Sequence, residues 1–292
     1  MKKLRGNLLL LTAAFIWGFS FVVTSSALES IPPMWYGASR YLLGALVLLP
    51  FVIPRFKDDK KIWKTTIEGG LLSGMVLFIG TAFQQYGMLV TAPGKSGFLS
   101  SFYLIFTPLI SFLFLKKKIG KSVVFAIGLA MVGFYFLCIH GDLSLSINDI
   151  FILCCAFFYA IQILIIDHYA KAEVDPVSLT FCQFISSGLL FLLASLILET
   201  PTFSVLLEAK WMMLYAGVIS SGMAYTFQVI GQRDSDTTSA TLLMSLESVF
   251  SVLTEWLVLH TVMSIYEYLG CILIFIAVII VQLPEKENEH DR

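Results

Sequence analysis

The sequence predicts an all-α integral membrane protein, with ten transmembrane helices arranged as two inverted five-helix repeats. A very apolar composition, ten apolar segments of helical length and a spacing that recurs along the chain predict this fold class. Of 292 residues, 58% are hydrophobic and 13% are charged, whereas soluble proteins carry about 25% charged residues. The formal net charge of −1 gives no basic surface of the kind that binds nucleic acid. We therefore expect a lipid bilayer, and no nucleic acid, around this chain.

Ten segments between clusters of charged and turn-forming residues are long enough to span a bilayer. A hydrocarbon core of about 30 Å needs roughly 20 apolar residues per helix, and the segments lack the alternation of β-barrel strands. The first has the basic start of a signal peptide, but its length and its bulky aromatics predict an uncleaved first helix. The predicted helices are 7–28, 33–54, 66–90, 97–115, 122–139, 149–168, 177–198, 211–231, 237–259 and 266–283.

The distribution of Lys and Arg orients these helices. With a cytosolic N-terminus, the basic clusters that begin at Lys2, Arg55 and Lys116 all lie on the cytosolic side. The opposite side holds only Lys95 and Lys210. Cytosolic loops of membrane proteins carry the excess of basic residues. We therefore predict a multi-pass protein of the cell (plasma) membrane with both termini in the cytosol.

A spacing in the first half of the chain recurs in the second half. A shift of 144 positions, from 83 to 227, carries one Phe-Gln pair onto another, and the same shift carries Leu115 onto Leu259. The predicted repeats are residues 1–143, with the first five helices, and 144–292, with the last five and a short cytosolic C-terminal tail. Because five is odd, the two halves enter the membrane from opposite sides. Inverted repeats are typical of secondary transporters that bind their substrate near the midplane.

Glu247 lies about ten residues from either end of the ninth segment, which places it roughly 15 Å deep in the bilayer. Its exposure to lipid would cost at least ~2.5 kcal/mol, so the side chain should face a partner, a cavity or water. A functional reading is a group that binds a proton or contacts a cation in a pathway. The alternative is a neutral side chain bonded to a neighbouring helix for packing alone.

Arg40 is the one basic residue well inside a predicted span, and Glu255 lies at a similar depth. The two residues are candidates for a structural charge pair. Arg40 could instead contact an anion or a carboxylate, and its counterpart in the second half is the uncharged Gln183.

Gln84 and Gln228 are related by the repeat and have aromatic neighbours. Amides beside aromatic walls suit a small polar or aromatic solute, and hydrogen bonding between helices is the alternative role. The five cysteines lie in apolar segments, and the four histidines lie at helix ends or in the tail. Neither set has the spacing of a metal site or a catalytic group. We predict no cofactor, no metal and no enzymatic activity.

The run from Thr91 to Lys121 and its counterpart from Thr237 to Trp256 resemble EamA-type members of the drug/metabolite transporter superfamily. The resemblance covers nearly the whole chain and implies ten helices in two inverted repeats around a central cavity. Ser248 stands where the family pattern has proline, which leaves open whether the ninth helix kinks beside Glu247. The cavity-lining positions that the resemblance implies are Trp17, Gln84, Tyr103, Tyr159, Gln228 and Glu247.

The sequence thus predicts a secondary transporter, and an exporter, for a small metabolite such as an amino acid or a related solute. It would work by alternating access, with protons as the candidate coupling ion through Glu247. One alternative is a membrane enzyme acting on lipid-linked substrates, but its polar residues should cluster at an interface and here they are scattered. Another is a non-transporting scaffold or sensor, which should carry a soluble output domain. The sequence does not indicate an oligomeric state.

Overall fold

The computed structural model describes residues 2–57, 60–116, 120–138, 146–172, 174–260 and 264–282. Within these ranges all regular structure is helical, which confirms the predicted all-α membrane class. Eight helical stretches of the described chain are long and apolar enough to cross a membrane, and 121–136 and 268–280 are shorter apolar helices. The elements are α1 (Lys2–Leu28), α2 (Pro33–Val52), η1 (Ile53–Lys57), α3 (Lys60–Met88), α4 (Pro93–Ser100), α5 (Tyr103–Leu115), α6 (Lys121–Cys138), α7 (Ile147–Ala170), α8 (Pro176–Leu198), α9 (Phe203–Glu208), α10 (Lys210–Leu214), η2 (Tyr215–Met223), α11 (Ala224–Asp234), α12 (Thr237–Met244), α13 (Glu247–Leu259) and α14 (Ile265–Gln282).

The observed helices follow the predicted segments with differences in bounds, number and continuity. The third helix begins at Lys60, and the short helix α9 was not predicted. The segments 97–115 and 237–259 are each broken into two helices, and 211–231 consists of α10, the π-helical η2 and α11. The predicted helix ends at 139 and 283, the boundary between 143 and 144, and the tail after 282 lie outside the described residues.

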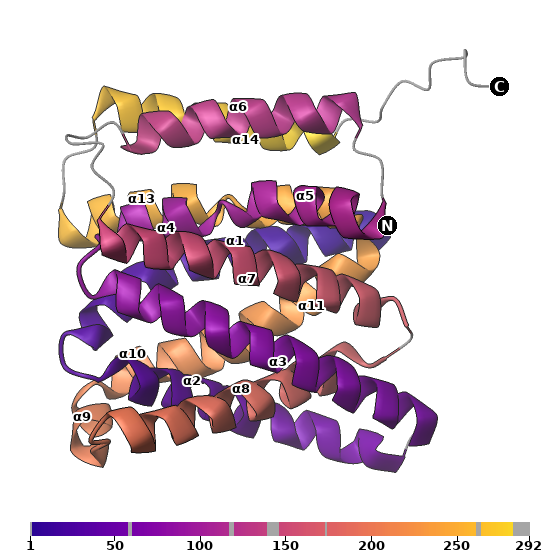
Figure 1. Ribbon diagram of the computed structural model, residues 1–292, viewed down its shortest axis with the longest axis vertical. Helices are drawn as coiled ribbons and strands as arrows, with labels where there is room; N and C mark the ends of the chain where they lie inside the picture. The colour runs from indigo at the N-terminus through magenta and orange to yellow at the C-terminus, as the bar shows by residue number, and fades with distance from the viewer. Residues whose placement is uncertain are drawn as a thin grey trace.

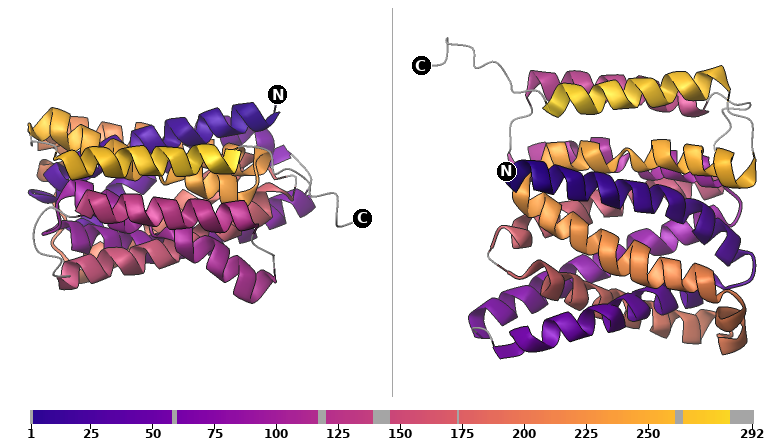
Figure 2. Two further views of the ribbon diagram at one scale, coloured as in Figure 1. Left: turned by 90° about the horizontal axis from the view of Figure 1, so that it is seen from above. Right: turned by 180° about the vertical axis from the view of Figure 1, so that it is seen from behind.

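Two helix pairs bound the molecule, and the other helices lie between them. The pair of α6 and α14 forms one end, and α2 packs against α8 at the other (Figure 1). Figure 2 shows the same arrangement from behind. Between these pairs, α1 packs against α11 and α13, while α7 packs against α3 and α5. Small residues allow close approach, since a Cβ on Gly74 of α3 would lie 2.5 Å from the carbonyl oxygen of Gln183 in α8.

The breaks in the fourth and ninth segments have the same backbone form. At the first, the Leu104 amide donates to the Ser101 carbonyl at 2.9 Å, and at the second, the Ser248 amide donates to the Ser245 carbonyl at 3.1 Å. Both bonds span three residues instead of four. Ser245 also donates its hydroxyl to the Leu242 carbonyl at 2.8 Å, and such back-bonding bends helices. The ninth span is therefore broken beside Glu247 without a proline.

The two broken spans also end in the same way. Lys116 follows α5 with a φ of 53°, and His260 follows α13 with a φ of 54°. Such left-handed residues commonly end helices. The shift of 144 relates both features, because it carries 101 to 245 and 116 to 260. The matched spacing seen in the sequence thus corresponds to matched backbone geometry.

Candidate functional site

A cavity lies among the middle helices, and residues of both broken spans line it. Its volume is about 50 Å³, which is room for a few water molecules at roughly 10–15 Å³ each. Arg40 also lines its wall. Six of its lining residues are those that the sequence singled out, namely Trp17, Gln84, Tyr103, Tyr159, Gln228 and Glu247.

Glu247 is the first residue of α13, so the helix break sets the position of its side chain. The residue is 5% exposed and lines the cavity. Its carboxyl group lies near the side chains of Ser101 and Tyr103, which belong to the other broken span. The Tyr103 hydroxyl is buried and makes no hydrogen bond to the described residues. No ion pair of Glu247 occurs in the described chain, and the two side chains near its carboxyl group are uncharged.

Arg40 projects from α2 into the same cavity and is 5% exposed. Its Nη2 atom donates to the Ser220 hydroxyl at 3.0 Å, and its Nε atom donates to the Ser221 hydroxyl at 3.3 Å. The guanidinium carbon also lies 5.6 Å and 5.2 Å from the ring centroids of Tyr36 and Tyr41. Both serines belong to the π-helical η2, and π-helical turns are frequent at functional sites.

The predicted charge pair of Arg40 and Glu255 is absent among the described contacts. Glu255 accepts a hydrogen bond from the Gly94 amide instead. The sequence predicts similar depths for the two residues, but α2 packs against α8 and η2, whereas α13 packs against α1 and α4. The position of a residue along its helix can be derived from the sequence, but the identity of the helix that packs beside it cannot.

Gln84 belongs to a continuous hydrogen-bond network on one side of the cavity. The Tyr159 hydroxyl donates to Gln84 Oε1 at 3.0 Å, and the Gln84 amide donates to Ser100 at 3.2 Å. The hydroxyls of Tyr159 and Thr81 lie 3.1 Å apart, and those of Thr81 and Tyr41 lie 2.7 Å apart. Both ends of the Gln84 amide are therefore engaged, and its orientation is fixed.

Gln228, the counterpart of Gln84, belongs to a ladder of glutamines. Its amide nitrogen donates to Gln162 at 3.2 Å, and Gln162 donates to Gln183 at 3.2 Å. The Gln228 carbonyl oxygen is buried without a hydrogen-bond partner among the described residues. Because Gln228 lines the cavity, this oxygen is a candidate acceptor for a polar solute.

Trp17 gives the cavity an aromatic wall. Its indole nitrogen donates to the Ser220 carbonyl at 3.1 Å, and its ring meets Tyr225 edge to face, with centroids 4.9 Å apart. The ring position is therefore fixed by two contacts. Such a wall can contact the apolar part of a ligand.

Sequence reasoning missed three polar residues of the cavity wall, Ser20, Thr24 and Gln162. Ser20 also contacts Ser220, with hydroxyl oxygens 2.9 Å apart. A signal was present, because Ser20 and Gln162 are related by the same spacing as Trp17 and Tyr159. Polar residues at matched positions of two apolar segments would have identified the helices that carry Ser20 and Gln162 as cavity walls.

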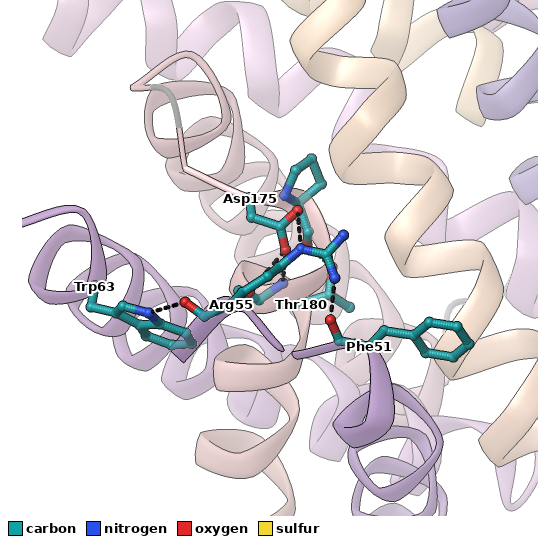
Figure 3. A network of polar contacts seen from close by, with 7 residues as sticks. Phe51, Arg55, Trp63, Asp175 and Thr180 are labelled. Atoms are coloured by element: carbon teal, nitrogen blue, oxygen red, sulfur yellow. Dashed lines mark hydrogen bonds and ion pairs between the residues drawn. The ribbon is translucent and has the colours of Figure 1, made fainter. Parts of the chain in front are cut away.

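The two ends of the α2 and α8 pair are held by different contacts. At one end the Glu199 carboxylate accepts from the Met34 and Trp35 amides, each at 2.8 Å. At the other end Arg55 Nε lies 3.1 Å from Asp175 (Figure 3). Asp175 also caps α8 by accepting from the Ser178 amide at 2.8 Å. We name these the Glu199 contact and the Arg55 contact.

Sequence comparisons with known proteins point to one family. A sequence model described as the EamA-like transporter family matches residues 4–139 and again 146–283. A protein of Archaeoglobus fulgidus named as an uncharacterized transporter is 33% identical over 286 residues, covering 97% of this chain and 87% of that protein. The uncharacterized transporter YoaV of Bacillus subtilis is 25% identical over 274 residues, covering 91% and 92%. A solved crystal structure matches with a TM-score of 0.70 at 18% identity, covering 95% of this chain and 96% of that one, which shows a shared fold.

Proposed function

The chain belongs to the EamA-like transporter family, and on that premise we propose that it is a secondary transporter that moves a small metabolite by alternating access. The family and the names of the relatives support a multi-pass membrane transporter and not an enzyme. An amino acid or a related solute is the proposed substrate. Export as the direction of transport stays a prediction from the family resemblance.

We propose that the chain crosses the membrane ten times, as inverted repeats that span 1–143 and 144–292. Breaks at Ser101 and Ser245 and left-handed residues at 116 and 260 support this architecture. The two matches of one family model, to residues 4–139 and 146–283, support it as well. The helix pairing has the expected form, since α1 packs on α11 and α13 as α7 packs on α3 and α5.

We further propose an orientation in the plasma membrane with both termini in the cytosol. The Arg55 contact then lies on the cytosolic side, close to the basic residues Lys60, Lys61 and Lys64. This placement agrees with the excess of basic residues in cytosolic loops. The Glu199 contact lies on the outer side.

The substrate site is the central cavity, with Trp17, Gln84, Tyr103, Tyr159, Gln228 and Glu247 as its wall. The observation that carries this proposal is that all six residues, from six predicted spans, line one cavity. At about 50 Å³ the cavity holds waters and not a metabolite, so the helices around it must separate to admit the substrate. Movement of packed helices about a central site is the basis of alternating access.

Glu247 is the proposed proton-carrying group. Ionisable residues within spans commonly form proton relays, and this one lines the cavity with uncharged neighbours. Its place at the start of α13 also puts it where movement of the break would change its surroundings.

Transport by purified protein in proteoliposomes tests the proposed function. Vesicles are loaded in turn with members of a panel of amino acids, amines, carboxylic acids and nucleosides, and exchange with the labelled solute is measured with and without a pH gradient. We expect saturable exchange of at least one solute, and accumulation only when a gradient is present. Exchange no faster than in protein-free vesicles for every member would contradict transport, and accumulation indifferent to the gradient would contradict proton coupling.

A further inference from the structure

We infer that a second pocket, at the ends of three spans, binds the phosphate of an anionic phospholipid headgroup. Its volume is about 200 Å³, against about 50 Å³ for the central cavity. It lies where α3 begins at Lys60, α8 begins at Pro176 and α11 ends at Asp234, and all three belong to candidate membrane spans. Its wall includes Ile62, Trp63, Thr66, Asp175, Ser178 and Arg233.

Arg233 is the phosphate-binding group of this pocket. Its Nε atom lies 3.6 Å from Asp234 Oδ1, which is beyond hydrogen-bond distance, and its guanidinium makes no hydrogen bond to the described residues. Asp234 also pairs with Arg5, so its charge is compensated without Arg233. A guanidinium presents paired donors that match the geometry of a phosphate. At Arg233 these donors are not used by the described part of the chain.

The carboxylate in the pocket wall, Asp175, is compensated by other groups. It lies 3.1 Å from Arg55 Nε (Figure 3), and it accepts from the amide and the hydroxyl of Ser178, each at 2.8 Å. The exposed Lys60 and Lys61 directly precede the pocket residues of α3 along the chain. The charge near the pocket is therefore positive on balance. Basic clusters at the ends of spans attract anionic lipids.

The pocket also has an apolar side, which favours a phospholipid over a free phosphate. Trp63 and Ile62 line this side, and Ile62 is 38% exposed. The Trp63 indole nitrogen donates to the Arg55 carbonyl at 2.7 Å, which fixes the ring at the end of the span. Tryptophan is enriched where headgroups meet the hydrocarbon core. A phospholipid can pack its glycerol and first acyl carbons on such a wall, whereas inorganic phosphate gains nothing from it.

The repeat shows that the scaffold itself does not need this chemistry. Shifts of 144 and 143 relate Arg233 to Leu89 and Ser178 to Trp35, which are apolar residues at the opposite ends of the spans. The Trp35 ring there meets Phe203 edge to face, with centroids 5.4 Å apart. Since the same architecture is built at that end without a guanidinium, packing alone does not account for Arg233. A ligand at one end of the spans does.

Lipid binding by the purified protein in a neutral detergent tests the inference. Phosphatidylglycerol, phosphatidylcholine with the same acyl chains and inorganic phosphate are titrated separately, bound molecules are counted by native mass spectrometry, and Tm is measured. We expect saturable binding of phosphatidylglycerol with an increase in Tm, because a ligand of the folded state stabilises it. Phosphatidylcholine carries its own cation beside the phosphate and should bind at least about tenfold more weakly. Inorganic phosphate should leave Tm unchanged.

Arg233→Gln and Lys64→Gln are matched variants, since each removes one basic side chain from this end of the molecule. The Lys64 side chain is 79% exposed and is not among the described residues that line the pocket. We expect Arg233→Gln to weaken phosphatidylglycerol binding about tenfold and Lys64→Gln to weaken it less than about threefold. Arg233→Lys keeps the charge without the paired donors and should have an intermediate affinity.

Unchanged phosphatidylglycerol affinity in Arg233→Gln would overturn the inference, and so would phosphatidylcholine that binds as tightly as phosphatidylglycerol. An increase in Tm with inorganic phosphate as large as that with phosphatidylglycerol would overturn a lipid as the ligand. If Arg233→Gln does not fold, Arg233→Lys and the comparison of headgroups on the parent protein decide. No solute is transported in these measurements, so their failure would leave the proposed function intact.

Discussion

The breaks in the fourth and ninth spans share a backbone and differ in chemistry. The same shift carries Ser101 to Ser245, and it carries Tyr103, the first residue of α5, onto Glu247, the first residue of α13. One break presents a phenol to the cavity and the other presents a carboxylate. Alternating access needs related movements from both halves, but it does not need two copies of a binding group. The comparison therefore separates a symmetric scaffold from an asymmetric site.

The two glutamines give the same lesson at finer scale. Gln84 has both ends of its amide engaged by Tyr159 and Ser100, whereas the Gln228 oxygen has no partner among the described residues. Equivalent positions thus differ in what they can offer to a solute. We expect substitution of Gln84 to act mainly on stability and substitution of Gln228 to act mainly on transport.

The largest expected effect on transport is that of Glu247→Gln, which removes the carboxyl group from the break between α12 and α13. Glutamine cannot release a proton, so we expect accumulation driven by a pH gradient to fall at least about tenfold. Exchange at saturating solute should persist, because the cavity and the break remain. Proteoliposome uptake with an imposed gradient measures the first quantity, and counterflow without a gradient measures the second.

Tyr103→Glu in the background of Glu247→Gln makes this test sharper. It moves the carboxylate to the equivalent position of the other half. If only the presence of a carboxylate at a break mattered, the double variant would recover coupling. We expect no recovery, because Arg40 and the Gln228 oxygen keep their places, and full recovery would contradict an asymmetric site.

A proline scan is expected to have the next largest effect. Ser248 is the second residue of α13, where a helix tolerates proline. Ser248→Pro loses only the amide and hydroxyl bonds to the Ser245 carbonyl, so it should fold and transport with a loss of about 1 kcal/mol of stability. Ser251, one turn further, lies inside the helix, and Ser251→Pro should cost about 3 kcal/mol. Detergent Tm and yield of folded protein measure the difference. An equal loss of Tm for both proline variants would show that α13 does not begin a new helix at the break.

Much of the scaffold could be predicted from the sequence because hydrophobic length is a strong signal for a span. Polar residues inside such spans are costly in lipid, so Glu247 and Gln228 could be assigned to the interior without coordinates. Position along a helix follows from the rise per residue, and the repeat then related residues in the two halves.

The breaks and the partners could not be predicted in this way. At the break, the Ser245 hydroxyl donates to the Leu242 carbonyl and the Ser248 hydroxyl donates to the Ser245 carbonyl, and serines in other helices do not always make such bonds. The π-helical η2 leaves the apolar pattern intact, so nothing in the residue types shows that Ser220 and Ser221 meet Arg40. The contact of Glu255 with the Gly94 amide could not be predicted for the same reason, because contacts between helices depend on rotation and neighbours as well as depth.

Two tyrosine substitutions should have smaller effects on stability. They compare a hydroxyl that makes hydrogen bonds with one that makes none to the described residues. The Tyr159 hydroxyl contacts both Gln84 and Thr81, so Tyr159→Phe leaves buried partners unsatisfied and should cost about 1–3 kcal/mol. The Tyr103 hydroxyl makes no hydrogen bond to the described residues, and Tyr103→Phe should leave stability nearly unchanged. Thermal unfolding in detergent measures both. A larger loss for Tyr103→Phe would place its hydroxyl in a bond to Glu247.

The smallest expected effects separate the two ends of the α2 and α8 pair. Glu199 accepts from two amides in the first turn of α2, where a carboxylate also meets the positive end of the helix dipole, so Glu199→Gln should cost about 1 kcal/mol. Arg55 and Asp175 are 37% and 27% exposed, and such pairs contribute about 0–1 kcal/mol and weaken in salt. The loss of Tm for Arg55→Gln should therefore be smaller and should vanish in 1 M salt, roughly the concentration at which the Debye length is 3 Å. Because the Arg55 contact is the weaker one, we expect the ends of α2 and α8 near the Arg55 contact to separate more readily than the ends near the Glu199 contact. Hydrogen exchange of backbone amides that is faster near Glu199 than near Asp175 would contradict this prediction.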